Sequence, residues 1–250
     1  MLFRSPEQAV DLRLRTTASE FDNFGYGVSD SLGMRDHVSA RDLFVQKFRG
    51  KENEMLLCAF DGKHGATNQG HRISLVAKNM FVRNFTKELD EIKNDDEIEN
   101  ALRKAFLNFN KEINGILTAK KNKSFTPVPN MSKEALELNL VDDGNAGCTV
   151  SVIYIKDKKL YSANIGDIEA LLCRNNGDQF LLTEKHDPTN REEFERIRAS
   201  GGYVSGGGEL DGQLSVSRGV GFFNFLPHTH CGPTIRRFKI TNDDDMIILG

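Results

Sequence analysis

Residues 147–174, GCTVSVIYIKDKKLYSANIGDIEALLCR, contain three runs of β-branched and other apolar residues separated by short polar breaks. Runs of this composition are typical of β-strands, and the breaks KDK and GD are short enough to be tight turns. The stretch therefore predicts three consecutive strands, and these strands anchor the interpretation of the rest of the chain.

Two long helices are predicted before these strands. Apolar residues recur at three- and four-residue spacing from Ile73 to Phe85 and again from Ile98 to Ile113, which is typical of helices with one core-facing side. Shorter apolar runs at residues 24–28, 42–48 and 55–60 are strand candidates.

A shorter helix is predicted after the strands. Thr189 and Glu192 have the spacing of a capping box, and Phe194 and Ile197 supply an apolar face. The pair Gly201–Gly202 is expected to end this helix.

Further strand-like runs, FLLT, TIRRFKI and DMIIL, cover residues 180–183, 234–240 and 245–249. Strands in runs, then a pair of helices, then more strands indicate an α+β fold with antiparallel sheets and disfavour a βαβ repeat.

The composition narrows the class of protein. The 250 residues carry 33 Lys and Arg against 36 Asp and Glu, so the chain lacks the basic character expected of a nucleic-acid-binding protein. No apolar run has the length of a transmembrane helix. Three of the four cysteines lie inside apolar stretches and none forms a CxxC pair, which predicts buried free thiols in a reducing, cytoplasmic compartment.

We expect three regions along the chain. Residues 1–22 are interpreted as a leader or linker, and residues 23–250 as one domain. Within that domain, residues at about 118–146 are expected to form an exposed insertion. The chain stops directly after an apolar run at Gly250, so the domain is expected to be incomplete at its C-terminus.

Three aspartates lie at the ends of predicted strands. Asp61 and Asp167 each have a glycine neighbour, and Asp42 opens an earlier strand. Carboxylates that converge from separate strands suit hard cations such as Mg²⁺ or Mn²⁺, and two such ions can activate a water to attack a phosphoryl group. Asp-Gly is also a common turn, so spacing alone leaves the metal site and the plain turn both open.

Seven ordered blocks make a more specific pattern: YGVSDSLGMR, FDGKHG, GCTV, SANIGDIEALL, LTEKHDP, RIRASGGYV and DGQLSVSRGVG. From Tyr26 to Gly250 their order resembles the type 2C, metal-dependent Ser/Thr protein phosphatases. The resemblance implies two antiparallel β-sheets packed as a sandwich flanked by helix pairs, with a dinuclear Mg²⁺ or Mn²⁺ centre at one edge.

The resemblance also implies roles for individual residues. Asp61 matches the aspartate that bridges both metals, and Gly62 the residue that supplies a backbone carbonyl. Arg35 matches the arginine that grips the substrate phosphate, for which its guanidinium fork is suited. Asp167 matches the aspartate of a third, weaker metal, and His64 would be the general acid for the leaving alkoxide.

The sequence departs from the family pattern around this centre. Lys63 stands between the Gly and His of the family's Asp-Gly-His, where an ammonium would compete with a metal for the bridging carboxylate. Ser39 and Ala40 occupy the positions of the expected acidic pair. Asp42 becomes a metal ligand only if two residues are inserted.

Later blocks depart as well. Lys185 and Phe222 replace family aspartates, and the remaining metal aspartates are expected beyond Gly250. A phosphatase scaffold with an eroded acidic centre resembles the phosphatase-like segment of fungal adenylate cyclases. The segments DNFGYGVSDSLGMRDHVSARD and AFDGKHG support this assignment.

Two functional hypotheses follow. The first is a regulatory or scaffolding domain in a larger multidomain polypeptide of cAMP signalling, with weak or no phosphatase activity and a protein or phosphoprotein partner. It would be cytoplasmic, with any membrane attachment supplied by other domains. The second is an active Mg²⁺/Mn²⁺-dependent Ser/Thr phosphatase. An unrelated α+β binding domain would require the ordered blocks to be coincidence.

Overall fold

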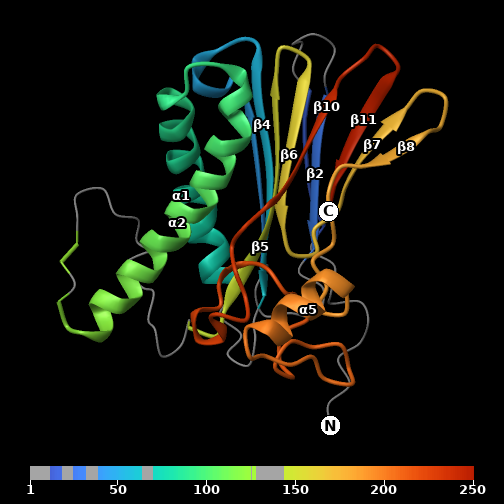
Figure 1. The fold of residues 1–250 in the computed structure, drawn as a ribbon. Helices are drawn as coiled ribbons and strands as arrows, with labels where there is room; N and C mark the ends of the chain where they lie inside the picture. Colours follow the sequence, from blue (N-terminus) through green and yellow to red (C-terminus); the bar gives the residue numbers. More distant parts are fainter. Residues whose placement is uncertain (1–11, 19–24, 32–38, 64–69, 125, 128–143) are drawn as a thin grey trace.

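The computed structural model describes residues 12–18, 25–31, 39–63, 70–124, 126–127 and 144–250. Their strands form a six-stranded sheet, a three-stranded sheet and a separate antiparallel pair. Helices α1 and α2 cover one face of the larger sheet, and the three-stranded sheet lies on its other side (Figure 1). The expected α+β architecture with two stacked antiparallel sheets is therefore confirmed.

The larger sheet is antiparallel throughout. Its order is β10 (Thr234–Lys239), β6 (Lys159–Ile165), β5 (Gly147–Lys156), β4 (Glu54–Lys63) and β3 (Ala40–Gln46), with β9 (Val220–Gly221) paired to one end of β5. Strands β5 and β6 arise from the apolar runs predicted to form strands. β5 is buried along most of its length, because layers pack on both of its faces.

The smaller sheet has the order β11 (Asp244–Leu249), β7 (Ala170–Arg174) and β8 (Gln179–Leu181). Its inner face packs on the larger sheet through one apolar cluster, in which Leu172 and Leu182 meet Ile153 and Leu160. The separate pair consists of β1 (Leu12–Ala18) and β2 (Gly25–Ser31).

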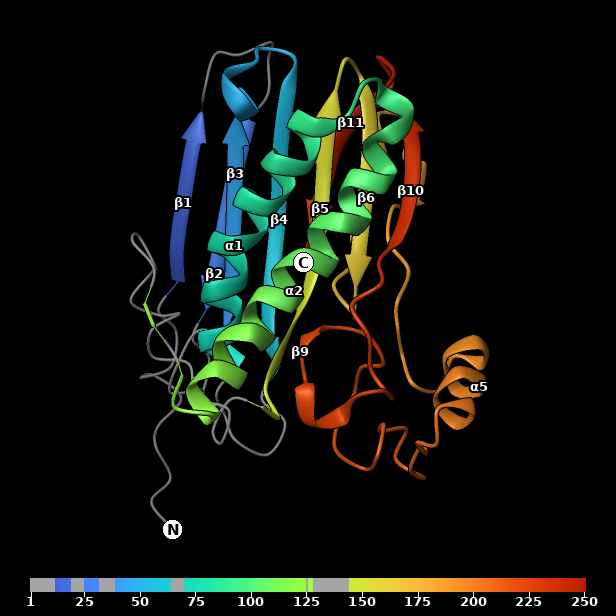
Figure 2. The same ribbon diagram turned by 60° about the vertical axis from the view of Figure 1, so that its left-hand side comes forward.

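Alternation along β4 divides the larger sheet into two faces. Leu56, Cys58 and Phe60 are buried in the main core, and the residues between them face the opposite way. Helices α1 (Gly70–Glu91) and α2 (Ile98–Lys121) lie side by side across the core face (Figure 2). Phe81 of α1 and Phe106 of α2 pack with ring centroids 5.1 Å apart, and burial of each such ring contributes about 1.5–3 kcal/mol.

Helix α5 (Arg191–Ala199) forms, but its predicted cap and face are partly wrong. Asn190, not Thr189, is the N-cap, because the Asn190 side chain accepts a hydrogen bond from the backbone N–H of Glu192. Ile197 is fully buried as expected, whereas Phe194 is 36% exposed. Glu193 is buried instead, and its ion pairs are the reason.

Other boundaries also differ from the expectations. Phe48 lies in a 3₁₀ turn, not in a strand, and α2 continues into the range expected to begin the exposed insertion. Ala146, at the other end of that range, is fully buried. The 3₁₀ turns are η2 (Phe48–Gly50), η4 (Asp95–Glu97) and η5 (Phe223–Phe225).

The cysteines are free thiols, and Cys58 and Cys148 are buried in the core, as predicted for apolar stretches. Cys231 is also buried, while Cys173 is partly exposed. Among the described helices, none combines the length and the apolar character needed to cross a membrane.

Candidate functional site

Asp61 lies near the end of β4 on the sheet face that points away from α1. Its neighbour Phe60 is buried in the main core, so alternation turns the Asp61 side chain to the other face. The carboxylate is 29% exposed, and the hydroxyl of Ser39 lies 3.5 Å from its Oδ1. Strand pairing places Asp61 opposite Ala40 of β3 and Thr149 of β5.

Asp167 is presented by a tight turn after β6. Gly166 has φ +93°, and a Cβ there would lie 2.1 Å from Thr149 Cγ2, so the turn requires glycine for both its conformation and its close approach to β5. The Gly166 N–H donates to His186 Nδ1 at 3.0 Å, and its carbonyl accepts from the His186 N–H at 2.9 Å. These contacts fix the turn that carries Asp167.

Lys63 joins the two aspartates. Its Nζ lies 2.8 Å from Asp61 Oδ2 and 3.0 Å from Asp167 Oδ2, and all three side chains are about one quarter exposed, at 24–29%. Burial alone would lower the pKa of Lys63, but hydrogen bonds and charge attraction from both carboxylates outweigh it and raise that pKa. We call Asp61, Lys63 and Asp167 the Lys63 cluster. It carries two negative charges and one positive charge.

Gly62 and Asp42, the other predicted metal ligands, are placed differently. A Cβ on Gly62 would lie 2.3 Å from the carbonyl oxygen of Gly70, so the start of α1 packs directly against the Gly62 backbone. Asp42 pairs with Ala59 of β4, two positions along from the pair that contains Asp61. It shares the Asp61 face of the sheet, because the facing residues are two apart on both strands.

The predicted catalytic residues Arg35 and His64 lie outside the described residues. The structure thus brings Asp61 and Asp167 together, with Lys63 between them. Within the segments it describes, no three His, Cys, Asp or Glu side chains gather closely enough to hold a metal ion.

The Lys63 cluster does not fit a dinuclear metal centre as it stands. Mg²⁺ requires near-octahedral oxygen coordination, and the cluster offers two carboxylates that already share an ammonium. One feature does suit a cation: Asp167 Oδ1 is buried and has no hydrogen-bond partner among the residues that the structure describes. The site therefore combines one carboxylate oxygen of Asp167 that has no partner in the described part of the chain with the ammonium group of Lys63.

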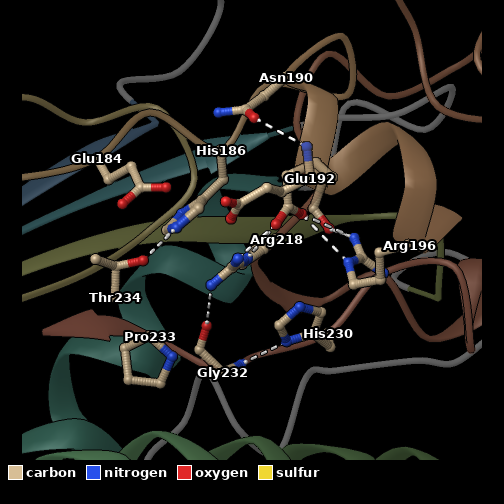
Figure 3. Close-up of polar contacts among 12 residues, drawn as sticks. Glu184, His186, Asn190, Glu192, Arg196, Arg218, His230, Gly232, Pro233 and Thr234 are labelled. Atoms are coloured by element: carbon tan, nitrogen blue, oxygen red, sulfur yellow. Dashed lines mark hydrogen bonds and ion pairs between the residues drawn. The ribbon is translucent and has the colours of Figure 1, made fainter.

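An ion-pair network joins α5 to Arg218, and His186 lies close to it (Figure 3). Glu193 of α5 is 3% exposed and accepts from two guanidinium groups. Arg218 donates to Glu193 Oε1 at 2.9 and 2.5 Å, and Arg196 donates to Oε2 at 3.3 and 3.0 Å. Burial alone would raise the pKa of Glu193, but these hydrogen bonds and charges lower it to about 2.

His186 connects this network to the Asp167 turn. Because Nδ1 accepts from the Gly166 N–H, the ring proton lies on Nε2, which donates to Thr234 Oγ1 at 2.9 Å. Burial, aided by the positive charge of Arg218, lowers the pKa of His186 to about 3, so the ring is neutral near pH 7. The His186 carbonyl also accepts from the Ser217 N–H, next to Arg218.

This network was not predicted from the sequence. His186, Arg196 and Arg218 lie in the quoted blocks LTEKHDP, RIRASGGYV and DGQLSVSRGVG, whereas Glu193 lies just before the second of them. The signal available in the sequence was the spacing of Glu193 and Arg196. These residues are three apart, which places them on one face of a helix. Nothing in the spacing indicated that Arg218 joins them.

Phe222, at a position where the resemblance implies an aspartate, packs in the interior. Its ring is fully buried with Ile197 and Leu210. A Cβ on Gly147 or on Gly219 would lie 2.4 Å from this ring. The position is therefore an apolar packing site, and it has no ligand role.

The sandwich of antiparallel sheets, the outer helix pair and carboxylates converging at strand ends define a phosphatase-like fold. Residues 24–250 match the family described as Protein phosphatase 2C, and the chain belongs to this family. A serine-threonine phosphatase 2C from Toxoplasma gondii has the same fold, with a TM-score of 0.66 at 16% identity over 97% of this chain and 77% of that one.

The sequence relatives include adenylate cyclases. The adenylate cyclase of Lachancea kluyveri is 42% identical over 256 residues, and that of Podospora anserina is 34% identical over 245 residues. Both alignments cover 98% of this chain but only 13% and 11% of the relatives. The chain thus spans a small part of these relatives, whose length leaves room for further domains.

Proposed function

We propose that this chain is a regulatory or scaffolding domain that keeps the phosphatase fold and has weak or no phosphatase activity. The observation that carries the proposal is the Lys63 ammonium held between Asp61 and Asp167. An ammonium neutralises carboxylate charge but cannot act as the Lewis acid that turns a bound water into a nucleophile.

The net charge of the Lys63 cluster also disfavours binding of a phosphorylated substrate. The Lys63 cluster has a net charge of −1, so it repels a phosphate dianion that approaches without a divalent ion. The changes at Ser39 and Ala40 act in the same direction, because neither supplies a carboxylate for a cation.

The context we propose is an adenylate-cyclase polypeptide in cAMP signalling. Support comes from the two adenylate cyclases, each of which matches nearly the whole of this chain along a small part of its own length. In such a polypeptide the domain would bind a protein or phosphoprotein partner in the cytoplasm, and any membrane attachment would come from other domains.

The second candidate is an active Mg²⁺- or Mn²⁺-dependent protein Ser/Thr phosphatase. One observation favours it: Asp61 and Asp167 converge, and Asp167 Oδ1 has no partner among the described residues. Activity would require a metal to displace the ammonium. Arg35 and His64 would then hold the phosphate and protonate the leaving group.

Hydrolysis of a phosphothreonine peptide in Mn²⁺ separates the two candidates. We expect turnover far below about 1 s⁻¹, the lower end of ordinary enzymes, from the purified 250-residue chain. Asp61→Asn is the matched control, since contaminating phosphatase would survive this substitution. Turnover above that level that Asp61→Asn abolishes would refute the regulatory proposal and establish the enzyme.

A further inference from the structure

We infer that the ε-ammonium of Lys63 is a built-in counter-cation that blocks a divalent-cation site, and that neutralising this one side chain opens the site. The inference rests on the proposed function and deepens it, because it identifies what keeps metal away from an otherwise convergent carboxylate pair.

The first argument is position. Asp61 and Lys63 are two residues apart on one strand, so their side chains leave the same face of the sheet. Asp167 reaches that face from the turn after β6. The ammonium therefore has two carboxylate partners at hydrogen-bonding distance, at 2.8 and 3.0 Å.

The second argument is the surroundings of Lys63. Its pairing partner across the sheet is Gly147 of β5, which contributes no side chain. The ring of Phe222 fills the space that a side chain at residue 147 would occupy, and paired residues point to the same face. An apolar ring, which cannot supply an oxygen ligand, thus lies on this side of Lys63.

The third argument is strand anchoring. Lys63 is the last residue of β4, and β4 pairs with β5 along its whole length and with β3 over most of it. Lys63 itself pairs with Gly147 on one side, and the pairing with β3 ends at Asp61, so the ammonium moves mainly by rotation of the side chain. Leaving the cluster would expose two facing carboxylates without a cation between them, which is electrostatically unfavourable.

The fourth argument is what remains when the charge is removed. Lys63→Met keeps an unbranched side chain of similar length but leaves Asp61 and Asp167 with two uncompensated negative charges. Asp167 Oδ1 is already buried without a partner in the described part of the chain. Two carboxylates and ordered water are suitable ligands for Mn²⁺ or Mg²⁺.

The test is Mn²⁺ binding measured by calorimetry and by the electron paramagnetic resonance signal of free Mn²⁺. We expect the wild-type chain to bind Mn²⁺ weakly, and Lys63→Met to bind it at least about tenfold more tightly, since loss of one nearby charge exceeds the roughly 1.4 kcal/mol of a tenfold change. Lys63→Arg keeps the charge and should bind as weakly as wild type. Adding Asp167→Asn to Lys63→Met should remove the gain.

Equal Mn²⁺ affinity in the wild type and in Lys63→Met, at any strength, would overturn the inference. If Lys63→Met does not fold, the wild type still decides: its thermal midpoint should be the same in millimolar Mn²⁺ and in EDTA. A rise of several degrees would show a bound ion despite Lys63 and would overturn the inference. Phosphatase turnover is a separate readout, so failure of the proposed function is distinguishable.

Discussion

Glu193→Gln is expected to destabilise the domain strongly. The substitution preserves the shape of a side chain that is 3% exposed but removes the charge that Arg196 and Arg218 share. A fall in the Glu193 pKa from its ordinary 4.5 to about 2 corresponds to about 3 kcal/mol of folding free energy, at 1.36 kcal/mol per pKa unit. Breaking a buried ion pair typically costs about 3–5 kcal/mol. We therefore expect a loss of about 3–4 kcal/mol.

Urea denaturation followed by circular dichroism measures this loss directly. For a chain of this size the thermal midpoint should also fall by at least about 6 °C. Glu195→Gln is the matched control, because Glu195 is 65% exposed and pairs with Arg191 on the same helix. That control should change the free energy of unfolding by no more than about 0.5 kcal/mol.

The pH dependence gives a second check on the same residue. The folded-state pKa of Glu193 is depressed, so its contribution is complete above pH 4.5 and is lost as the pH falls towards 2. The difference between wild type and Glu193→Gln should therefore be constant from pH 7 to 5 and shrink below 4.5. A loss under about 1 kcal/mol at pH 7 would refute the role assigned to the network.

Three further predictions concern the core and the Asp167 turn. Phe222→Ala should cost about 3–5 kcal/mol in urea unfolding, because the ring that packs on Gly147 leaves a cavity. His186 has a folded pKa of about 3 against an ordinary 6.5, so unfolding takes up a proton at pH values between these two. The free energy of unfolding should therefore fall as the pH drops from 6.5 to 3, by up to about 1.4 kcal/mol per pH unit. His186→Asn should flatten this slope. Gly166→Ala should cost at least about 2 kcal/mol, since its Cβ would meet Thr149 and its φ is positive.

Matched variants keep these predictions specific. Gly177 has φ +88° with open space around it, so Gly177→Ala isolates the cost of the backbone conformation and should be milder than Gly166→Ala. Leu107 is 44% exposed, and Leu107→Ala should be nearly neutral beside Phe222→Ala. A stability profile between pH 7 and 4.5 that His186→Asn leaves unchanged would contradict the assignment of that histidine.

Much of the sandwich could be predicted because its strands and helices have local signals. β5 and β6 are dense in β-branched residues, and α1 and α2 repeat apolar residues at helical spacing. The errors have tertiary causes. Phe194 was expected to be buried, but Glu193 takes the inner position of α5 because two arginines from different segments compensate its charge.

The candidate site was partly predictable for a similar reason. Lys63 departs from the Asp-Gly-His pattern of the family, which is visible in the sequence. Strand alternation then places its side chain on the same face of the sheet as Asp61. The distance to Asp167 is not encoded locally, because it depends on the turn at Gly166 and on its contacts with Thr149 and His186.

The packing of Phe222 disfavours an acidic side chain at this position. Gly147 and Gly219 come from distant segments, and each accepts the ring where its own side chain would be. An aspartate at residue 222 would leave a void above both glycines and place a carboxylate against Ile197 and Leu210. An acidic residue at this position would therefore require coordinated repacking of the interior around Gly147, Gly219, Ile197 and Leu210.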